Sequence, residues 1–318
     1  MISVFEFGRL AHYIYKDAVV LGSYRSVINS LILKSDFDPA VRHDGFYEIL
    51  LDPTIQSKSA RSHGFYASFF VKIKDKRAVC AVIAIRGTNN LDNDMQDVKS
   101  WWRSVFDSHA RVIFPEHYMT QAKHFYFKVR RYCQQHLKLA NTNIFVTGHS
   151  LGGALAALLP TYYGFPIRAV TFNAPGIKDV SGAKPLWHRV INFRARYDFV
   201  SAIDYPIGAE WNIPVADHEA QAARSFAIAR EHERNGWSRL NIIDDVIECV
   251  DFLASVTHQH SMANLMTSLR QLAVMPGGLT SSDTFGAGQF TVEAVSSVRD
   301  NQPYDRFHPF SPQHEVAA

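Results

Sequence analysis

Apolar residues recur along the chain at two spacings, and the change from one spacing to the other predicts strands and helices in turn. Short apolar runs rich in β-branched and aromatic residues predict strands at 46–51, 65–74, 79–85, 143–147, 169–172 and 189–193. Amphipathic spacing predicts helices near the N-terminus and at 92–106, 116–139, 151–159, 217–234, 240–254 and 261–272. Strands that alternate with helices favour an α/β sheet, mostly parallel in its middle and flanked by helices.

The length of 318 residues fits one large domain with insertions as well as two small domains. We expect residues 1–275 to form one large domain, with an inserted helical segment around 206–239. Beyond Met275 the sequence turns to Gly, Ser, Pro and polar residues, and only 289–295 alternates as a strand does. Residues 276–318 are therefore expected to form a C-terminal tail or a small appendage.

Charge and composition exclude several classes of protein. The 33 basic and 30 acidic side chains are too evenly balanced for a nucleic-acid binder. The 47% of hydrophobic residues argues against a disordered chain. Three widely spaced cysteines, Cys80, Cys133 and Cys249, form neither a zinc-ligand pattern nor a disulfide framework. Cys80 lies inside an apolar run and is expected to be a buried, inert thiol.

The N-terminal segment has no basic start, long apolar stretch or small-residue cleavage site, so it does not resemble a secretory signal. No window approaches the roughly 18 apolar residues of a membrane-spanning helix. We expect a cytoplasmic protein, or one exported without an N-terminal signal peptide. The pI near 8.7 leaves attachment to an anionic membrane surface open, and the 22 Phe and 13 Tyr suffice to line an apolar groove.

The sequence Gly148-His149-Ser150-Leu151-Gly152 matches Gly-x-Ser-x-Gly between a predicted strand and a predicted helix. A sharp strand-to-helix turn of this kind exposes the serine hydroxyl at the carboxyl edge of an α/β-hydrolase sheet. The two glycines leave room where strand and helix approach each other closely. Ser150 is therefore the candidate nucleophile.

A serine nucleophile needs a base and an orienting carboxylate, and in this fold the chain order is Ser, then Asp or Glu, then His. Asp198 follows the predicted strand 189–193 and is the favoured carboxylate, with Asp204 as the competitor. His260 is the favoured base because it directly precedes Ser261, a candidate helix N-cap. His258 is the alternative.

Two hydrogen-bond donors should stabilise the oxyanion of the reaction. One is the backbone N–H of Leu151, directly after the candidate nucleophile. The other is expected in the loop Arg86-Gly87-Thr88 after an earlier strand, where Thr88 offers both its N–H and its hydroxyl. This chemistry requires no metal and no organic cofactor.

Five segments together resemble the class 3 lipase family, the fungal-lipase-like branch of the α/β-hydrolases. They are Ala84 to Thr88, Thr147 to Ala154, Thr171 to Gly176, Tyr197 to Val200 and His260 to Leu265. The resemblance implies a serine esterase with Ser150, Asp198 and His260 as its triad and Thr88 as its oxyanion residue. It also implies a lipid ester substrate, either an acylglycerol or a glycerophospholipid, and a lid formed by 89–114.

Alternatives to lipid ester hydrolysis stay open at this stage. An acyltransferase or a thioesterase would use the same triad, and a lipid- or protein-binding homologue would use the fold without catalysis. Phospholipase A1, lysophospholipase and acylglycerol lipase activities are not separated by the sequence. It also identifies no protein partner.

Overall fold

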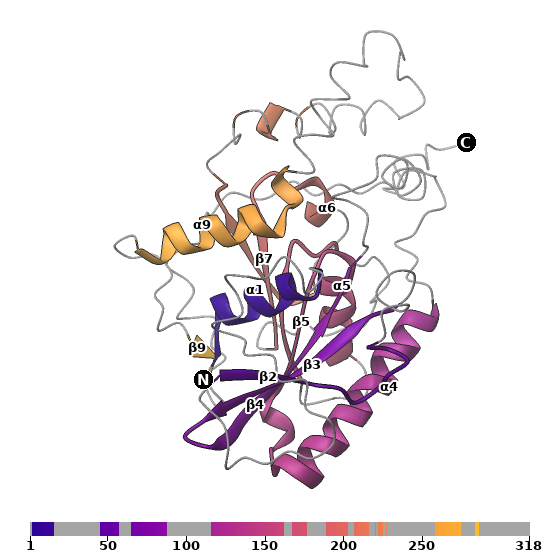
Figure 1. Cartoon of the computed structure of the whole chain (residues 1–318). Helices are drawn as coiled ribbons and strands as arrows, with labels where there is room; N and C mark the ends of the chain where they lie inside the picture. The colour runs from indigo at the N-terminus through magenta and orange to yellow at the C-terminus, as the bar shows by residue number, and fades with distance from the viewer. Residues whose placement is uncertain are drawn as a thin grey trace, which may run out of the picture.

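The computed structural model describes residues 2–15, 45–56, 65–87, 116–161, 167–176, 189–202, 207–215, 220, 222–224, 227, 258–274 and 284–285. Its centre is a seven-stranded sheet in the order β2-β3-β4-β5-β6-β7-β8 (Figure 1). The strands are β2 (Gly45–Ile49), β3 (Ala67–Lys74), β4 (Arg77–Ile85), β5 (Ile144–His149), β6 (Arg168–Phe172), β7 (Val190–Ala195) and β8 (Ala209–Ile213). Strands β2 to β4 pair antiparallel, whereas β4 to β8 pair parallel.

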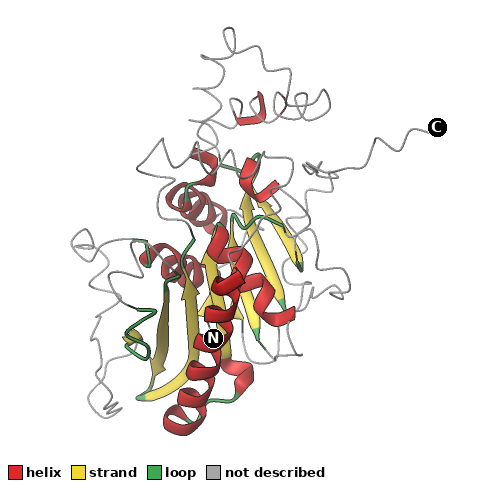
Figure 2. Cartoon of the chain, turned by 90° about the vertical axis from the view of Figure 1, so that its right-hand side faces the viewer, coloured by secondary structure: helices red, strands yellow, loops and turns green. Residues whose placement is uncertain are grey.

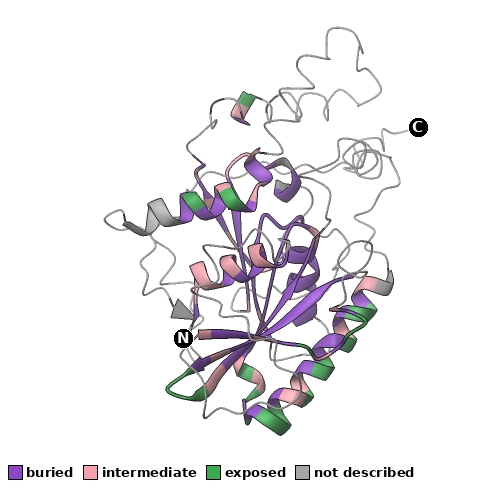
Figure 3. Ribbon diagram, in the orientation of Figure 1, coloured by how far each residue is buried: buried purple, intermediate pink, exposed green. Residues whose placement is uncertain are grey.

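Apolar side chains cover both faces of this sheet. Successive side chains of a strand point to opposite faces. In β4, Val82 and Ala84 accordingly join one hydrophobic cluster, whereas Ile83 and Ile85 join the other. A strand buried on both faces reads as a continuous apolar run, which is why the central strands are recognisable in the sequence. Figure 3 shows the resulting buried centre.

Helices lie on both sides of the sheet (Figure 2). Helix α1 (Val4–Tyr13) and helix α9 (Met262–Val274) contribute to one hydrophobic cluster, and α4 (Glu116–Tyr132) and α5 (Leu151–Leu158) contribute to the other.

Helix α1 begins with a capping box: the Ser3 hydroxyl accepts the N–H of Glu6, and the Glu6 carboxylate accepts the N–H of Ser3. Helix α4 continues into a π-helical turn, Cys133–Leu137. A short helix, α6 (Phe199–Ala202), follows β7.

The six strands predicted between 46 and 193 and the mostly parallel centre of the sheet are confirmed, with shifts of a few residues at the strand ends. Strand β8 (Ala209–Ile213), at the edge of the sheet, was not expected, because it lies inside the segment 206–239 predicted to be helical. Its Ala209, Trp211 and Ile213 are buried and alternate with partly exposed residues, so a strand satisfies its pattern better than a helix. Predicted helices 92–106 and 240–254 lie outside the described residues.

Two short strands join segments near the two ends of the chain. Strand β1 (Ile2–Ser3) pairs antiparallel with β9 (Thr284–Phe285). The predicted strand 289–295 lies outside the described residues, and the domain boundaries at 275–276 stay a prediction. Within the described ranges, no helix combines the length and apolar character that crossing a membrane would require.

Candidate active site

Ser150 occupies a strained turn between strand β5 and helix α5. Its backbone dihedrals are φ 55° and ψ −131°, which a residue with a side chain rarely adopts. The turn is held by the Ser150 N–H, which donates to the carbonyl of Phe172 at the end of β6 over 3.0 Å. Although Ser150 stands at the N-cap of α5, its side chain makes no capping hydrogen bond to this described helix. The hydroxyl is therefore not engaged in the role that serine usually has there.

Gly152 permits the first turn of α5 to touch the end of strand β4. A Cβ atom at this position would lie 2.2 Å from the carbonyl oxygen of Ile85 and 2.7 Å from the nitrogen of Gly87. Because both contacts are with backbone, neither could move aside cheaply. The glycine of the sequence motif is thus required by the close approach of helix and strand, as expected for a nucleophile elbow.

Asp198 and His260 lie side by side, although they are 62 positions apart in the sequence. Asp198 follows β7, and His260 precedes α9. The Nδ1 atom of His260 lies 3.1 Å from Oδ1 and 3.0 Å from Oδ2 of Asp198. Both residues are buried, at 3% exposure for His260 and 0% for Asp198. This arrangement fixes the orientation of the imidazole ring.

The carboxylate of Asp198 is stabilised in its charged form despite its burial. Burial by itself would raise the pKa of Asp198, but the charge and the hydrogen bond of His260 and a hydrogen bond from Ser201 hold this pKa below its usual value. The backbone N–H groups of Val200 and Ser201 donate to Oδ1 and Oδ2, each over 3.2 Å. The two N–H groups at the start of α6 therefore stabilise the ionised form of the Asp198 carboxylate.

The other ring nitrogen of His260, Nε2, takes no part in the contact with Asp198. This atom is buried and has no hydrogen-bond partner among the residues that the structure describes. Since Nδ1 faces a carboxylate, it carries the proton in the neutral ring, and Nε2 carries the lone pair. A lone pair at this position is what a general base needs to remove a proton from a hydroxyl.

His149, directly before Ser150, supports the segment that carries His260. Its Nε2 lies 2.8 Å from the backbone carbonyl oxygen of His260, so it must carry a proton and donate it. Burial, together with the proximity of His260, lowers the pKa of His149 to about 3. His149 is therefore neutral at ordinary pH, and its Nδ1 is an acceptor that lies 3.3 Å from the hydroxyl of Tyr15.

Tyr15, just beyond helix α1, joins the loop after β4 to the nucleophile turn. Its hydroxyl accepts the N–H of Gly87 over 2.8 Å, and its single proton faces both the carbonyl oxygen of His149, at 3.1 Å, and Nδ1 of the same residue, at 3.3 Å. Sequence reasoning missed this residue because a tyrosine at the end of an amphipathic helix resembles an ordinary core residue. No local motif marks it, and its partners are 72 and 134 residues away.

The other predicted site residues are placed only in part. Leu151 is the first residue of α5, where backbone N–H groups have no partner within the helix. Thr88 lies outside the described residues. Its neighbour Gly87 is described, and a Cβ atom built at Gly87 would lie 3.2 Å from Cβ of Ser150.

The alternative carboxylate, Asp204, also lies outside the described residues. His258 is described, and its carbonyl accepts the N–H of Ser261 and the side-chain amide of Asn264.

The described residues also bear on metal binding and on the reactivity of cysteine. The described part of the chain contains no group of His, Cys, Asp and Glu side chains able to hold a metal ion. Cys80 and Cys133 are free and buried, and burial raises the pKa of each thiol to about 12. A thiol with such a pKa stays protonated and is a poor nucleophile, so the prediction of an inert Cys80 is in keeping with its surroundings.

A mostly parallel sheet whose central strand β5 leads through a strained serine turn into α5, with a carboxylate after β7 and a histidine before a later helix, is the α/β-hydrolase fold. Comparison with known proteins agrees with this class. Residues 82–205 match the model of the family described as Lipase (class 3), which confirms the resemblance seen in the motifs.

Short segments of curated proteins are similar to the chain. A 37-residue segment is 65% identical to "Putative lipase ATG15" of Debaryomyces hansenii, covering 12% of this chain and 6% of that protein. A 33-residue segment is 73% identical to the protein of the same name from Candida glabrata, covering 10% of this chain and 6% of that protein. The matches thus span a small part of these relatives.

Solved lipase structures align over more of the chain at low identity. The extracellular lipase LipA from Serratia marcescens is 17% identical, covers 90% of this chain and 52% of its own, and has a TM-score of 0.45. The Lip2 lipase from Yarrowia lipolytica is 18% identical, covers 66% of this chain and 77% of its own, and has a TM-score of 0.37.

Proposed function

We propose that this protein hydrolyses carboxylic esters of lipids, with Ser150 as nucleophile, His260 as general base and Asp198 as the carboxylate that orients it. The observation that carries the proposal is the buried pair of Asp198 and His260, joined over 3.0 Å, in a chain whose only Gly-x-Ser-x-Gly turn holds Ser150 in a strained conformation. The match of residues 82–205 to the class 3 lipases supports a lipid ester as the substrate.

In the first half of the reaction, Nε2 of neutral His260 takes the proton of the Ser150 hydroxyl as its oxygen attacks the ester carbonyl. Asp198 stabilises the imidazolium that forms and keeps Nδ1 protonated. The carbonyl oxygen becomes an oxyanion, for which the N–H of Leu151 and the N–H or hydroxyl of Thr88 are the proposed donors. Each such donor contributes about 3 kcal/mol to transition-state stabilisation in other serine hydrolases.

The tetrahedral intermediate then collapses, and the bond to the alcohol breaks. His260 gives its proton to the departing alcohol oxygen, which leaves the acyl group esterified to Ser150. Water attacks this acyl-enzyme with His260 again as base, and the fatty acid is released while Ser150 regains its proton. His260 thus carries the Ser150 proton to the alcohol in the first half of the cycle and a proton of water back to Ser150 in the second.

A fluorophosphonate probe tests the nucleophile directly, because it reacts with an activated serine and reports no particular substrate. We expect the wild-type protein to be labelled and to hydrolyse a p-nitrophenyl acyl ester. The Ser150→Ala variant should be unlabelled and keep less than about a hundredth of the activity, with its fold intact. An unlabelled wild-type protein, or a Ser150→Ala variant that retains its activity, would overturn the proposal.

A panel of substrates addresses the finer assignment. Phospholipid, lysophospholipid and triacylglycerol should be compared side by side, with vesicles and emulsions as the physical form. Phospholipase A1 or lysophospholipase activity would agree with the slightly basic pI near 8.7 and an anionic surface, whereas triacylglycerol hydrolysis would agree with the match to the class 3 lipases. Addition of an alcohol acceptor separates hydrolysis from acyl transfer, since transfer yields a new ester in place of the fatty acid.

A further inference from the structure

Asn173 lies directly after strand β6 and is fully buried. Its backbone has φ 46°, in the left-handed region that asparagine tolerates better than most residues with a side chain. Its own N–H donates to the carbonyl of Phe193 on β7 over 2.8 Å. These features fix the backbone, so the side-chain amide is held in one place.

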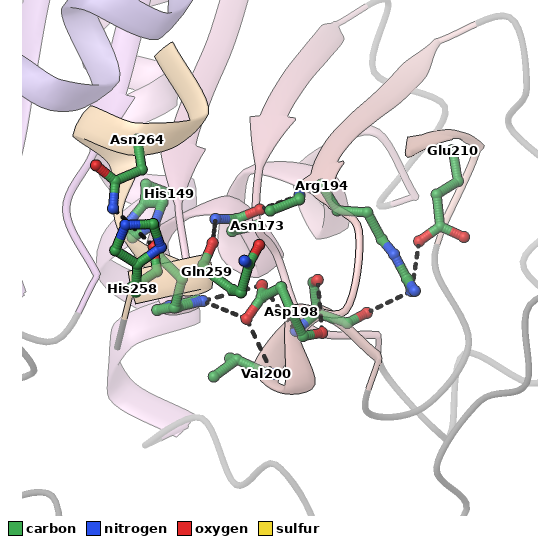
Figure 4. A network of polar contacts seen from close by, with 12 residues as sticks. His149, Asn173, Arg194, Asp198, Val200, Glu210, His258, Gln259 and Asn264 are labelled. Atoms are coloured by element: carbon green, nitrogen blue, oxygen red, sulfur yellow. Dashed lines mark hydrogen bonds and ion pairs between the residues drawn. The ribbon is translucent and has the colours of Figure 1, made fainter. Parts of the chain in front are cut away.

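The side-chain amide of Asn173 bridges two segments that are far apart in the sequence (Figure 4). Its Oδ1 accepts the N–H of Ala195 over 2.7 Å, and its Nδ2 donates to the carbonyl of Gln259 over 3.1 Å. Ala195 ends β7, and its carbonyl accepts the N–H of Asp198 over 3.1 Å, which closes the turn that presents the carboxylate. Gln259 is the residue before His260.

One amide thus holds the segment of the carboxylate and the segment of the imidazole at a fixed separation. Both bonds are buried, and removing the amide would leave the N–H of Ala195 and the carbonyl of Gln259 without these partners. Each unsatisfied group would favour a shift of its segment toward another partner or toward water. A displacement of about 1 Å in a catalytic group can cost about 100-fold in rate.

We propose that Asn173 is a positioning residue that sets the distance between Asp198 and His260, an inference that rests on the function proposed above. Asn173 touches neither the ester nor the reacting oxygen. It acts through the two peptide groups that carry the acid and the base, and it therefore affects how well His260 removes and returns a proton.

The Asn173→Gly variant tests this role, because glycine adopts φ 46° without strain and removes both side-chain hydrogen bonds. We expect kcat to fall by about 10- to 100-fold with KM nearly unchanged, since ground-state binding of the ester does not involve the acid–base pair. The low-field proton resonance of Nδ1–H in the bond between His260 and Asp198 should be lost or broadened. The acid limb of the pH profile of kcat/KM should also move.

Asn192→Ala is the matched control. Asn192 is likewise a buried amide, but its Nδ2 donates to the carbonyls of Ile207 and Ala209, over 2.8 and 3.2 Å, and its Oδ1 accepts the hydroxyl of Thr171. Its loss should lower the thermal midpoint while leaving the low-field proton and the pH profile in place. If Asn173→Gly does not fold, Asn173→Asp replaces it: the aspartate keeps the acceptor for Ala195, loses the amide donor to Gln259 and, when ionised, places a negative charge against the Gln259 carbonyl, so it too should displace the segment of His260.

The outcomes separate this inference from the proposed function. If the wild-type protein reacts with the fluorophosphonate probe, and the Asn173 variant keeps the wild-type kcat, low-field proton and pH profile, the inference is wrong while the function stands. The inference is also wrong if the Asn173 variant loses activity only in proportion to its unfolded fraction. If the wild-type protein itself does not react, the proposed function fails first.

Discussion

Nε2 of His149 donates a hydrogen bond to the backbone carbonyl of His260 over 2.8 Å, so the residue before the candidate nucleophile holds the backbone of the candidate base. The two imidazole rings lie close together, with their centroids 4.7 Å apart. The Nδ1 atom of the same His149 ring faces the hydroxyl of Tyr15. The buried ring of His149 therefore links the segment that carries His260, the turn that carries Ser150, and Tyr15, just beyond helix α1.

The burial of the His149 ring should make the fold sensitive to acid. Burial lowers the pKa of His149 from 6.5 to about 3, so between these values the unfolded chain binds a proton that the folded chain does not. The free energy of unfolding must then decrease as the pH falls through this window, by roughly 3 kcal/mol at about pH 4. The His149→Gln variant keeps a side-chain N–H but cannot be protonated. Chemical denaturation at about pH 7 and pH 4 should show a smaller difference for the variant, and an equal difference would contradict this assignment.

The two histidines before α9 should differ sharply in their importance for activity. His260→Ala removes the ring that faces Asp198, and hydrolysis of a p-nitrophenyl ester should fall by more than about 1,000-fold. His258→Ala should have a much smaller effect, because the hydrogen bonds that His258 accepts from Ser261 and Asn264 go to its backbone carbonyl, which the variant retains. Steady-state kinetics of both variants test this contrast, and the reverse order would transfer the role of base to His258.

The hydroxyl of Tyr15 should matter more for the rate than for substrate binding. Tyr15→Phe removes the acceptor of the Gly87 N–H and the proton donor that faces His149, and Gly87 adjoins the proposed oxyanion residue Thr88. A loosened loop should lower kcat by about 10-fold with little change in KM. Tyr13→Phe is the control, since Tyr13 is the last residue of helix α1, two positions before Tyr15, and its hydroxyl reaches Glu48 instead. Equal kcat values for the two variants would show that the Tyr15 hydroxyl does not organise the site.

Adding a methyl group at Gly152 should disrupt the nucleophile turn. In Gly152→Ala, the new Cβ would lie 2.2 Å from the Ile85 carbonyl oxygen, so helix α5 or strand β4 must shift, at a cost of about 2 kcal/mol or more. Gly8→Ala is the comparison, because the atoms nearest its added Cβ are the flexible ends of Met266 and Met262, and alanine also favours a helix. Thermal unfolding should show a large loss of stability for the first change and a small one for the second. Similar midpoints would show that the turn has more room than the contacts indicate.

Much of the site was predictable because its signals are local. The strained turn at Ser150 requires glycine at fixed offsets, and a strand before it and a helix after it are readable from their periodicity. Asp198 and His260 were reached from chain order and from their positions after a strand and before a helix. The strand Ala209–Ile213 was missed, because its five residues alternate too briefly to stand out from the polar segments around them.

The amino-acid pattern alone determined most of the described strands and helices, the parallel centre of the sheet and the serine turn, since these depend mainly on neighbouring residues and on the geometry of single elements. Only the tertiary structure decided which side chains meet across elements. Tyr15 meets Gly87, Asn173 joins Ala195 to Gln259, and His149 holds the carbonyl of His260. These partners are 22 to 111 residues apart, and a hydrogen bond between them depends on how the sheet and its helices pack, which no local pattern of residues encodes.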